Sequence, residues 1–257
     1  MLALKFAYDG TKFDGFARQP KGKTVEGRII SALRAIGIGA NPLPASRTDK
    51  WVSARGNVLV LETDFPKDKI IAALNGCLEH IWFYAVAEAP QGFKPRYAEW
   101  RKYRYCLPDE NFDVPAMKKC ASLLVGEHDF SALAKLEEGK NPKRNVLSLS
   151  VRKHGRIVEI DIKAQSFLWS MVRGITELLR AAGKSAIGEN GVRQMLEGKR
   201  RFDIGYAAPE NLVLMEVYHK GLKFENDGKA LEKMRREIDG ERRKAALRQK
   251  VLAALKG

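Results

Sequence analysis

The stretch Leu2-Ala3-Leu4-Lys5-Phe6-Ala7-Tyr8 opens the chain and sets the pattern on which the fold is built. Large apolar residues alternate with small or charged ones, which is the period of a strand with one buried face. Asp9-Gly10-Thr11 ends this strand, and a helix is predicted from Thr24, a good N-cap residue, to Gly37, a natural stop. The chain therefore begins as a mixture of strand and helix.

Similar patterns predict the elements that follow. In the first half they are a strand at 57–63, a helix from Pro66 to Leu78, and strands at 81–89 and 97–107. In the second half they are helices at 114–125, 167–182 and 189–197, and strands at 145–153, 156–164 and 212–218. Because the halves share an element order, we expect two α+β lobes, each with helices on one face of its sheet. A cleft between two lobes is a common place for a site.

The chain is expected to divide into three parts: a first lobe at 1–107, a second lobe at 108–220, and a basic helical extension at 221–257. The extension has the pattern of one helix broken at Gly240, or of two helices. Its arginines and lysines lie largely opposite its apolar residues. Two interpretations stay open: the extension packs on the body, or it adds a contact to RNA phosphates.

Charge is the most informative part of the composition. The 257 residues include 46 Lys and Arg against 31 Asp and Glu, a formal net charge of +15. The segment from Lys220 onward carries 12 basic and 6 acidic residues, which leaves an excess of nine on residues 1–219. A field of this sign over the whole chain attracts a polyanion, with nucleic acid the leading candidate. The alternative is a basic but inert surface.

Several classes of protein are disfavoured by what the sequence lacks. The three cysteines and four histidines are scattered, so we expect neither a disulfide framework nor a metal site. The apolar runs are too short to span a bilayer, and the N-terminus lacks the layout of a signal peptide, so a cytoplasmic location is expected. There is no P-loop, dinucleotide-binding, serine-hydrolase or zincin motif, which argues against an ATPase, a Rossmann enzyme, a serine hydrolase and a zincin.

Four segments combine polar, aromatic and glycine residues in a way that ordinary surface loops do not. Three residues of these segments that could act in a site also have ordinary structural interpretations. Asp49 can cap a turn, Tyr103 can be a half-buried strand residue, and Arg173 can extend to solvent along an apolar surface. Within the strand predicted at 97–107, the two tyrosines of residues 101–105 are expected on one face, with Arg101, Lys102 and Arg104 on the other. The segments are Tyr8 to Gln19, Arg47-Thr48-Asp49, Arg101-Lys102-Tyr103-Arg104-Tyr105 and Ser166 to Arg173.

Together these segments resemble the tRNA pseudouridine synthase A family, in order and in spacing, over about residues 3–218. Further landmarks of the resemblance are Gly126-Glu127-His128-Asp129-Phe130 and Ala208-Pro209. The resemblance implies two ferredoxin-like lobes with mostly antiparallel mixed sheets flanked by helices around a central catalytic cleft. It also implies a cofactor-free isomerase that converts uridine to pseudouridine in the anticodon stem-loop of tRNA, around positions 38–40, and that acts as a homodimer.

The resemblance also assigns roles to single residues. Asp49 matches the catalytic aspartate, and Arg173 matches the arginine that pairs with it. Arg47 matches the arginine linked to base flipping, in which a side chain fills the place that the base leaves. Tyr103 matches the tyrosine that stacks on the target uracil.

The chain departs from the family at three places. Lys50-Trp51-Val52-Ser53 stands where a small residue, glycine, valine and histidine are usual, Phe16 replaces a tryptophan, and the basic tail after Lys220 lies outside the family pattern. We therefore expect a divergent member of archaeal type. The alternative function is a non-catalytic tRNA-binding or RNA-chaperone protein on the same scaffold. An inert basic protein fits only the charge, and a glycosidase lacks its second carboxylate.

Overall fold

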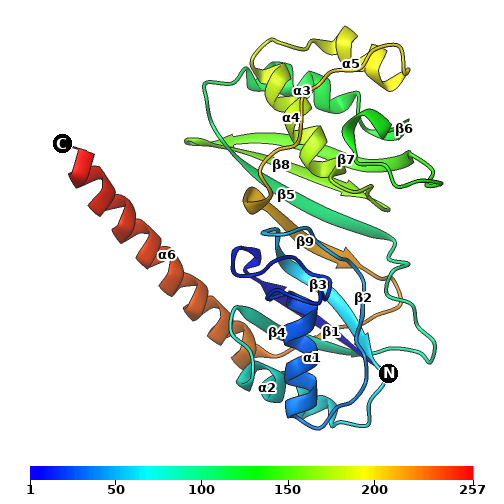
Figure 1. Ribbon diagram of the computed structural model, residues 1–257, viewed down its shortest axis with the longest axis vertical. Coiled ribbons are helices and arrows are strands. Elements are labelled where there is room, and N and C mark those ends of the chain that lie inside the picture. Colours follow the sequence, from blue (N-terminus) through cyan, green and yellow to red (C-terminus); the bar gives the residue numbers. More distant parts are fainter. Residues whose placement is uncertain (257) are drawn as a thin grey trace.

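The computed structural model describes residues 1–256 as two lobes joined along one sheet, with a long helix leading away from them (Figure 1). The elements, in chain order, are β1 (Leu2–Tyr8), η1 (Gly10–Lys12), α1 (Val25–Ala35), β2 (Leu43–Pro44), β3 (Ser53–Leu61), α2 (Lys67–Gly76), β4 (Ile81–Glu88), β5 (Trp100–Pro108), α3 (Val114–Ser122), β6 (Gly126–Asp129), η2 (Ser131–Leu133), β7 (Lys143–His154), β8 (Ile157–Ala164), α4 (Met171–Gly183), α5 (Glu189–Leu196), η3 (Pro209–Asn211), β9 (Leu212–Tyr218), β10 (Glu225–Asn226) and α6 (Gly228–Lys256).

Each half of the chain has the βαββαβ order of a ferredoxin-like unit. In the second half, β5, β7, β8 and β9 are its four strands, and they lie in the sheet in the order β9-β5-β8-β7. In the first half, β4, β1 and β3 lie side by side and the short β2 pairs with β3, which gives the same order. The expected pair of ferredoxin-like α+β lobes is confirmed.

The two lobes nevertheless share a single ten-stranded sheet, where the sequence analysis expected one sheet for each. The join is the parallel pairing of β3 with β9, at Ser53 with Val213 and at Ala54 with Leu214. All other strand pairs are antiparallel. The two strands that form this join are far apart in the chain, so the pairing cannot be predicted from the local sequence pattern of either strand.

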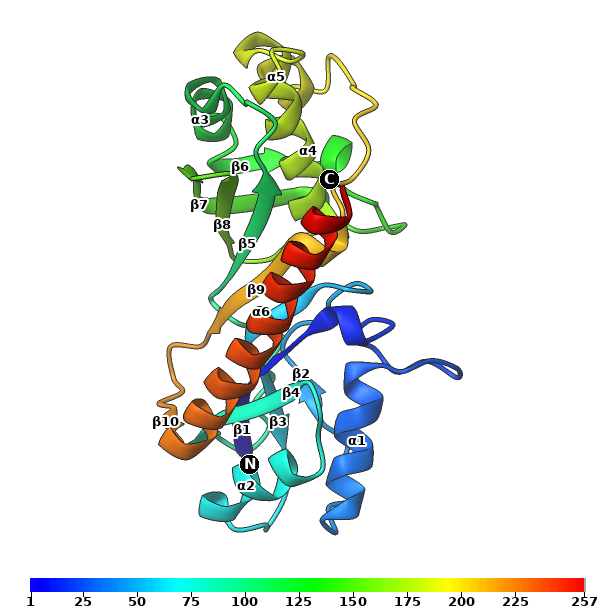
Figure 2. The ribbon, with the colours of Figure 1, turned by 90° about the vertical axis from the view of Figure 1, so that its left-hand side faces the viewer.

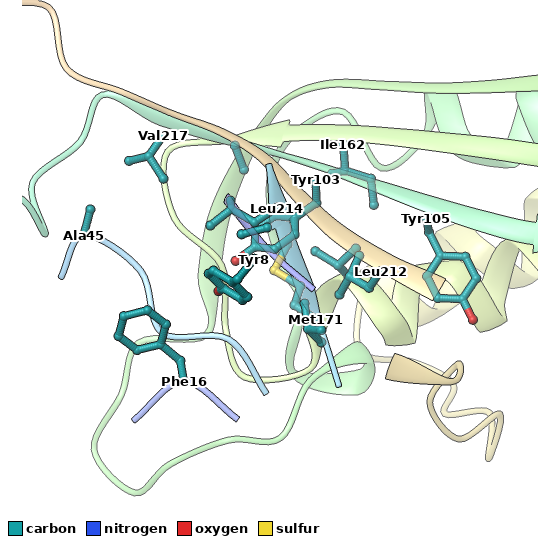
Figure 3. Close-up of a cluster of buried hydrophobic side chains, with 14 of the residues drawn as sticks. Tyr8, Phe16, Ala45, Tyr103, Tyr105, Ile162, Met171, Leu212, Leu214 and Val217 are labelled. Atoms are coloured by element: carbon teal, nitrogen blue, oxygen red, sulfur yellow. The ribbon is translucent and has the colours of Figure 1, made fainter. Parts of the chain in front are cut away.

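The hydrophobic core is also continuous across the join. Side chains from both lobes meet there in one buried cluster (Figure 3). Tyr8 comes from β1, Tyr103 from β5, Met171 from α4, and Leu212 and Leu214 from β9. Because the lobes bury side chains against each other, the loops at the join lie on a closely packed and therefore rigid core.

Most predicted elements are confirmed to within a few residues. The Thr24 side chain accepts a hydrogen bond from the backbone N–H of Gly27, as expected of an N-cap. Two boundaries are wrong: β3 begins at Ser53 instead of 57, and α4 begins at Met171 instead of 167. The division of the chain at 107 and 220 stays a prediction, and β5 pairs with β8 and β9 of the second half.

From Gly228 onward the extension forms one uninterrupted helix, α6, so the predicted break at Gly240 is wrong. Only its first third packs on the body, where Ala230 and Met234 are buried and the Trp82 indole donates to Glu237 over 2.6 Å. Residues 241–256 are all exposed, and the helix runs past the edge of the sheet into open space (Figures 1 and 2). A glycine in a helix costs about 1 kcal/mol relative to alanine, which is too little to break a helix of 29 residues.

Candidate active site

Asp49 lies in the loop that precedes β3, at the join between the lobes. Neighbours in the sheet hold this loop from below: the Tyr8 hydroxyl and the Thr48 hydroxyl lie 2.8 Å apart, and Asn57 donates to the Ser46 carbonyl over 2.9 Å. The segment Gly10–Lys12 (η1), which follows β1, packs against it. A Cβ added to Gly10 would lie 2.1 Å from the Val52 carbonyl oxygen, so only glycine allows this approach.

Arg101 ties this loop to the loop before α4. Its guanidinium donates to the Ser46 hydroxyl over 2.9 Å, to the Gln165 carbonyl over 2.9 Å and to the Ala45 carbonyl over 3.0 Å. A further bond reaches the Arg96 carbonyl over 2.7 Å. The side chain is buried and has no carboxylate partner among the described residues, and burial lowers its pKa.

The position of Arg101 corrects the sequence analysis, which put it on the face opposite the tyrosines. Side chains on a strand alternate, so residues 101, 103 and 105 share one face. Arg101, Tyr103 and Tyr105 are all buried there, whereas Lys102 and Arg104 lie on the other face against Asp161. Strict alternation along residues 101–105 predicts that Arg101 lies on the same face as the two tyrosines.

The carboxylate of Asp49 meets one side chain on each oxygen. The Trp169 indole N–H donates to Oδ1 over 3.0 Å, and a guanidinium nitrogen of Arg173 lies 3.6 Å from Oδ2. Arg173 is itself held by a hydrogen bond from its Nε to the Ala207 carbonyl. About a third of the Asp49 side chain stays exposed, so the carboxylate is oriented and open to a ligand.

The start of α4 sets the positions of both partners. A Cβ added to Gly174 would lie 2.1 Å from the Leu133 carbonyl oxygen, so the helix lies directly against η2. Ser170, the residue before the helix, has a φ of 60°, a conformation that non-glycine residues rarely adopt. Its buried hydroxyl has no hydrogen-bond partner in the described chain. This turn directs Trp169 and Arg173 toward Asp49 from the same helix end.

A cavity of about 460 Å³ opens beside the Asp49 carboxylate. Tyr103 and Phe167 line it, with ring centroids 5.1 Å apart and ring planes nearly perpendicular. Burial raises the pKa of Tyr103 to about 12, so its hydroxyl is protonated at neutral pH. The exposed Arg47 also lines the cavity, and its guanidinium forms no ion pair within residues 1–256. Aromatic walls and surrounding cations suit a flat, anionic ligand.

The structure thus brings together all four residues that the sequence singled out: Arg47, Asp49, Tyr103 and Arg173 line one cavity. Three other participants were missed. Trp169 was quoted in its motif without a role, Arg101 was assigned to the wrong face, and Lys135 was not considered. Lys135 extends over the Trp169 ring, with its nitrogen 4.9 Å from the centroid, and comes from a loop with no periodic signal.

The described residues also bear on metal binding and on membrane crossing. Among residues 1–256, no three His, Cys, Asp or Glu side chains gather as metal ligands would. None of the described helices combines the length and the apolar character that crossing a membrane requires.

Comparison with known proteins adds independent evidence. A family model described as tRNA pseudouridine synthase matches residues 120–220. A tRNA pseudouridine synthase A of Thermococcus sibiricus is 45% identical over 92% of this chain and 91% of its own length. That of Pyrococcus horikoshii is 42% identical over 93% and 92%.

A third relative bears on the extension. The tRNA pseudouridine synthase A of Pyrococcus abyssi is 41% identical over 98% of this chain and 95% of its own length. That match takes in most of the segment after Lys220, which the sequence analysis set outside the family pattern. Among solved structures, a Cbf5-Nop10-Gar1 complex matches with a TM-score of 0.38 and 12% identity, covering 70% of this chain and 46% of that one, a likeness too weak to carry a conclusion.

Proposed function

Because the chain belongs to the tRNA pseudouridine synthase A family, we propose that it isomerises uridine to pseudouridine in tRNA, with Asp49 as the reactive carboxylate. The observation that carries the proposal is the Asp49 carboxylate, held between Trp169 and Arg173 at the edge of a cavity lined by aromatic rings. The alternative, a tRNA-binding protein without activity, would not require an aligned carboxylate.

The reaction balances within the nucleotide. The C1′–N1 bond breaks, the uracil turns, and C5 bonds to C1′; C5 then loses its proton and N1 gains one. Asp49 bonds transiently to the flipped-out nucleotide and is released again before the product leaves, and the guanidinium of Arg173 orients the carboxylate. The ring of Tyr103 stacks on the uracil, a contact worth about 1–3 kcal/mol. Arg47 fills the place of the extruded base, which lowers the cost of flipping.

The finer features of this function are also proposals. The target is a uridine of the anticodon stem-loop, around positions 38–40, and the protein acts as a cytoplasmic homodimer; both come from the family resemblance. The three free cysteines are compatible with a reducing compartment. Light scattering of the purified protein tests the dimer, which a mass near 29 kDa for the particle would exclude.

The function is tested by incubating the protein with unmodified tRNA transcripts and mapping pseudouridine by site-specific chemistry. We expect new pseudouridine at a defined position in the anticodon stem-loop. Tight binding of tRNA with no pseudouridine in any transcript would support the non-catalytic alternative.

The exposed part of α6 supports a role in holding tRNA. Residues 242–256 include six basic residues and no acidic one. Arg242 pairs with Asp239 and Lys244 with Glu241, but Arg243 forms no ion pair within the described chain. We propose that Arg243 and the basic residues that follow Lys244 contact phosphates of the bound tRNA.

Ending the chain after Glu241 should weaken tRNA binding while the body stays folded, because Ala230 and Met234 remain in place. Each lost phosphate contact lowers the slope of log affinity against log salt by about 0.7–0.9, so the slope should fall by about 2–5. Filter binding at several salt concentrations measures it.

Two full-length variants identify the cause. Neutralising Arg243, Arg248 and Lys250 should reproduce most of the effect, whereas alanine at the exposed Leu247, Val251 and Leu255 should leave the slope unchanged. If the apolar variant changes the oligomeric state and the charge variant binds tRNA normally, the helix is a protein interface and the proposed RNA contact is wrong.

A further inference from the structure

A second cavity, of about 780 Å³, adjoins the first at Asp49. It runs between the opening loop, at Asp14 to Gly22, and the turn that follows Asp49. Asp49, Trp169, Arg173 and Lys135 line both cavities, so the two spaces meet at the carboxylate. Neither the proposed isomerisation nor the fold accounts for this second space.

Trp51 is the unusual residue of the second cavity. The N–H of Val52 donates to the Asp49 carbonyl over 3.2 Å and closes a turn in which Trp51 takes the third position. Its φ is 69°, a conformation that glycine adopts freely and a bulky side chain does not. The family that the sequence resembles usually has glycine at this position. The chain therefore carries a strained tryptophan where the backbone favours no side chain at all.

This tryptophan does not contribute to the core. Its side chain is 44% exposed, so the strain is not offset by burial. The Lys50 nitrogen lies 4.9 Å from the centre of its ring and also pairs with Asp14 over 2.9 Å, which neutralises that carboxylate. A strained, exposed and oriented aromatic side chain beside a reactive group is the kind of outlier that points to function.

The rest of the cavity has matching chemistry. Trp169 offers a second indole, 51% exposed, and Lys21 and Lys135 add positive charge to the lining. Flat aromatic side chains with cations around them are how proteins hold single-stranded nucleotides, by stacking on the base and pairing with the phosphate. A flipped nucleotide stays bonded to both neighbours, so a uridine at Asp49 brings another nucleotide to this cavity.

We propose that the second cavity is a subsite for a nucleotide next to the target uridine, with Trp51 stacking on its base and Lys21 and Lys135 facing its phosphates. The inference rests on the proposed function, because the target uridine must occupy the first cavity. Trp51 then adds to substrate recognition and takes no part in the bond changes at Asp49.

Trp51→Gly is the variant that tests the subsite, because it removes the ring and relieves the backbone. Its thermal stability should equal or exceed that of the unchanged protein. Its affinity for an anticodon stem-loop RNA should fall about 5- to 150-fold, the range for one lost stacking contact. Turnover at saturating RNA should change little. Trp51→Phe, which keeps a ring, should recover most of the affinity, and Tyr97→Gly, another exposed aromatic that lines neither cavity, should bind normally.

Abasic RNAs decide whether the ring contacts a base. Stem-loops that lack the base on one side of the target uridine should bind the unchanged protein more weakly, and one of them should show no further loss with Trp51→Gly. The subsite is overturned if Trp51→Gly binds the intact stem-loop with an affinity within twofold of that of the unchanged protein. It is also overturned if removing a base lowers the affinity of the unchanged protein and of Trp51→Gly by the same factor, whichever base is removed. Pseudouridine formation by the unchanged protein is measured on the same RNA, and its absence counts against the proposed function instead.

Discussion

Asp49→Asn should abolish pseudouridine formation, lowering the rate by about a thousandfold or more, while tRNA binding and thermal stability stay close to those of the unchanged protein. Asparagine keeps the shape of the side chain and an oxygen that can still accept the Trp169 indole N–H. Its amide group is neutral and a poor nucleophile, so the reactive group is lost although the geometry remains.

The amide nitrogen would face the guanidinium of Arg173. At the present separation of 3.6 Å this replaces an attractive contact with a weakly unfavourable one, at a partly exposed site, so the cost in stability is small. Single-turnover assays on tRNA transcripts measure the rate, and filter binding measures the affinity. Asp68→Asn, an exposed carboxylate in the first turn of α2, is the matched control and should retain full activity. An Asp49→Asn protein that formed pseudouridine at a normal rate would falsify the assignment of the catalytic residue.

Arg101→Met should lower the free energy of unfolding by about 3 kcal/mol or more, because several buried neutral acceptors lose their donor at once. Methionine fills part of the space but leaves the Ala45 and Gln165 carbonyls and the Ser46 hydroxyl without their donor. A buried polar group left without a partner costs about 1–3 kcal/mol.

Activity should fall as well, even where Arg101→Met remains folded, because Ser46 precedes the Asp49 loop and Gln165 precedes Trp169. Without the hydrogen bonds of Arg101, the loops that carry Asp49 and Trp169 are no longer held at a fixed distance from each other. Urea denaturation gives the stability, and turnover below the unfolding transition gives the activity. Arg101→Lys should lose less stability, since one ammonium satisfies some of the acceptors. Arg55→Met, on an exposed site of β3, should change neither, and an Arg101→Met protein with an unchanged urea midpoint would refute the role of Arg101.

The two lobes could be predicted from the sequence because their elements depend on local physics. Alternating apolar residues, a threonine N-cap and glycines at helix ends act over a few residues, and they placed most helices and strands. The start of α4 was predicted too early because Phe167 and Leu168 continue the apolar pattern of the helix. They line the cavity instead, since the chain turns at Ser170 with a positive φ.

The candidate site was predicted in part. Arg47, Asp49, Tyr103 and Arg173 were identified because their residue types and order resemble a known family, and their roles stay predictions. Arg101 escaped because its charge suggested a solvent-facing side chain, whereas its hydrogen bonds to carbonyls allow burial. The strain at Trp51 could not be read from the residue type alone, because φ is a property of the folded turn.

By itself, the sequence determined the α+β class, the two lobes, the excess of positive charge and the short list of residues around Asp49. Each follows from short-range patterns or from the chain's own composition. Only the tertiary structure decided that the lobes share one sheet, that Trp169 and Arg173 contact different oxygens of Asp49, and that α6 extends free of the body from residue 241 onward. These contacts join residues far apart in the chain, and their energy comes from shape and hydrogen-bond geometry that exist only once both lobes have packed.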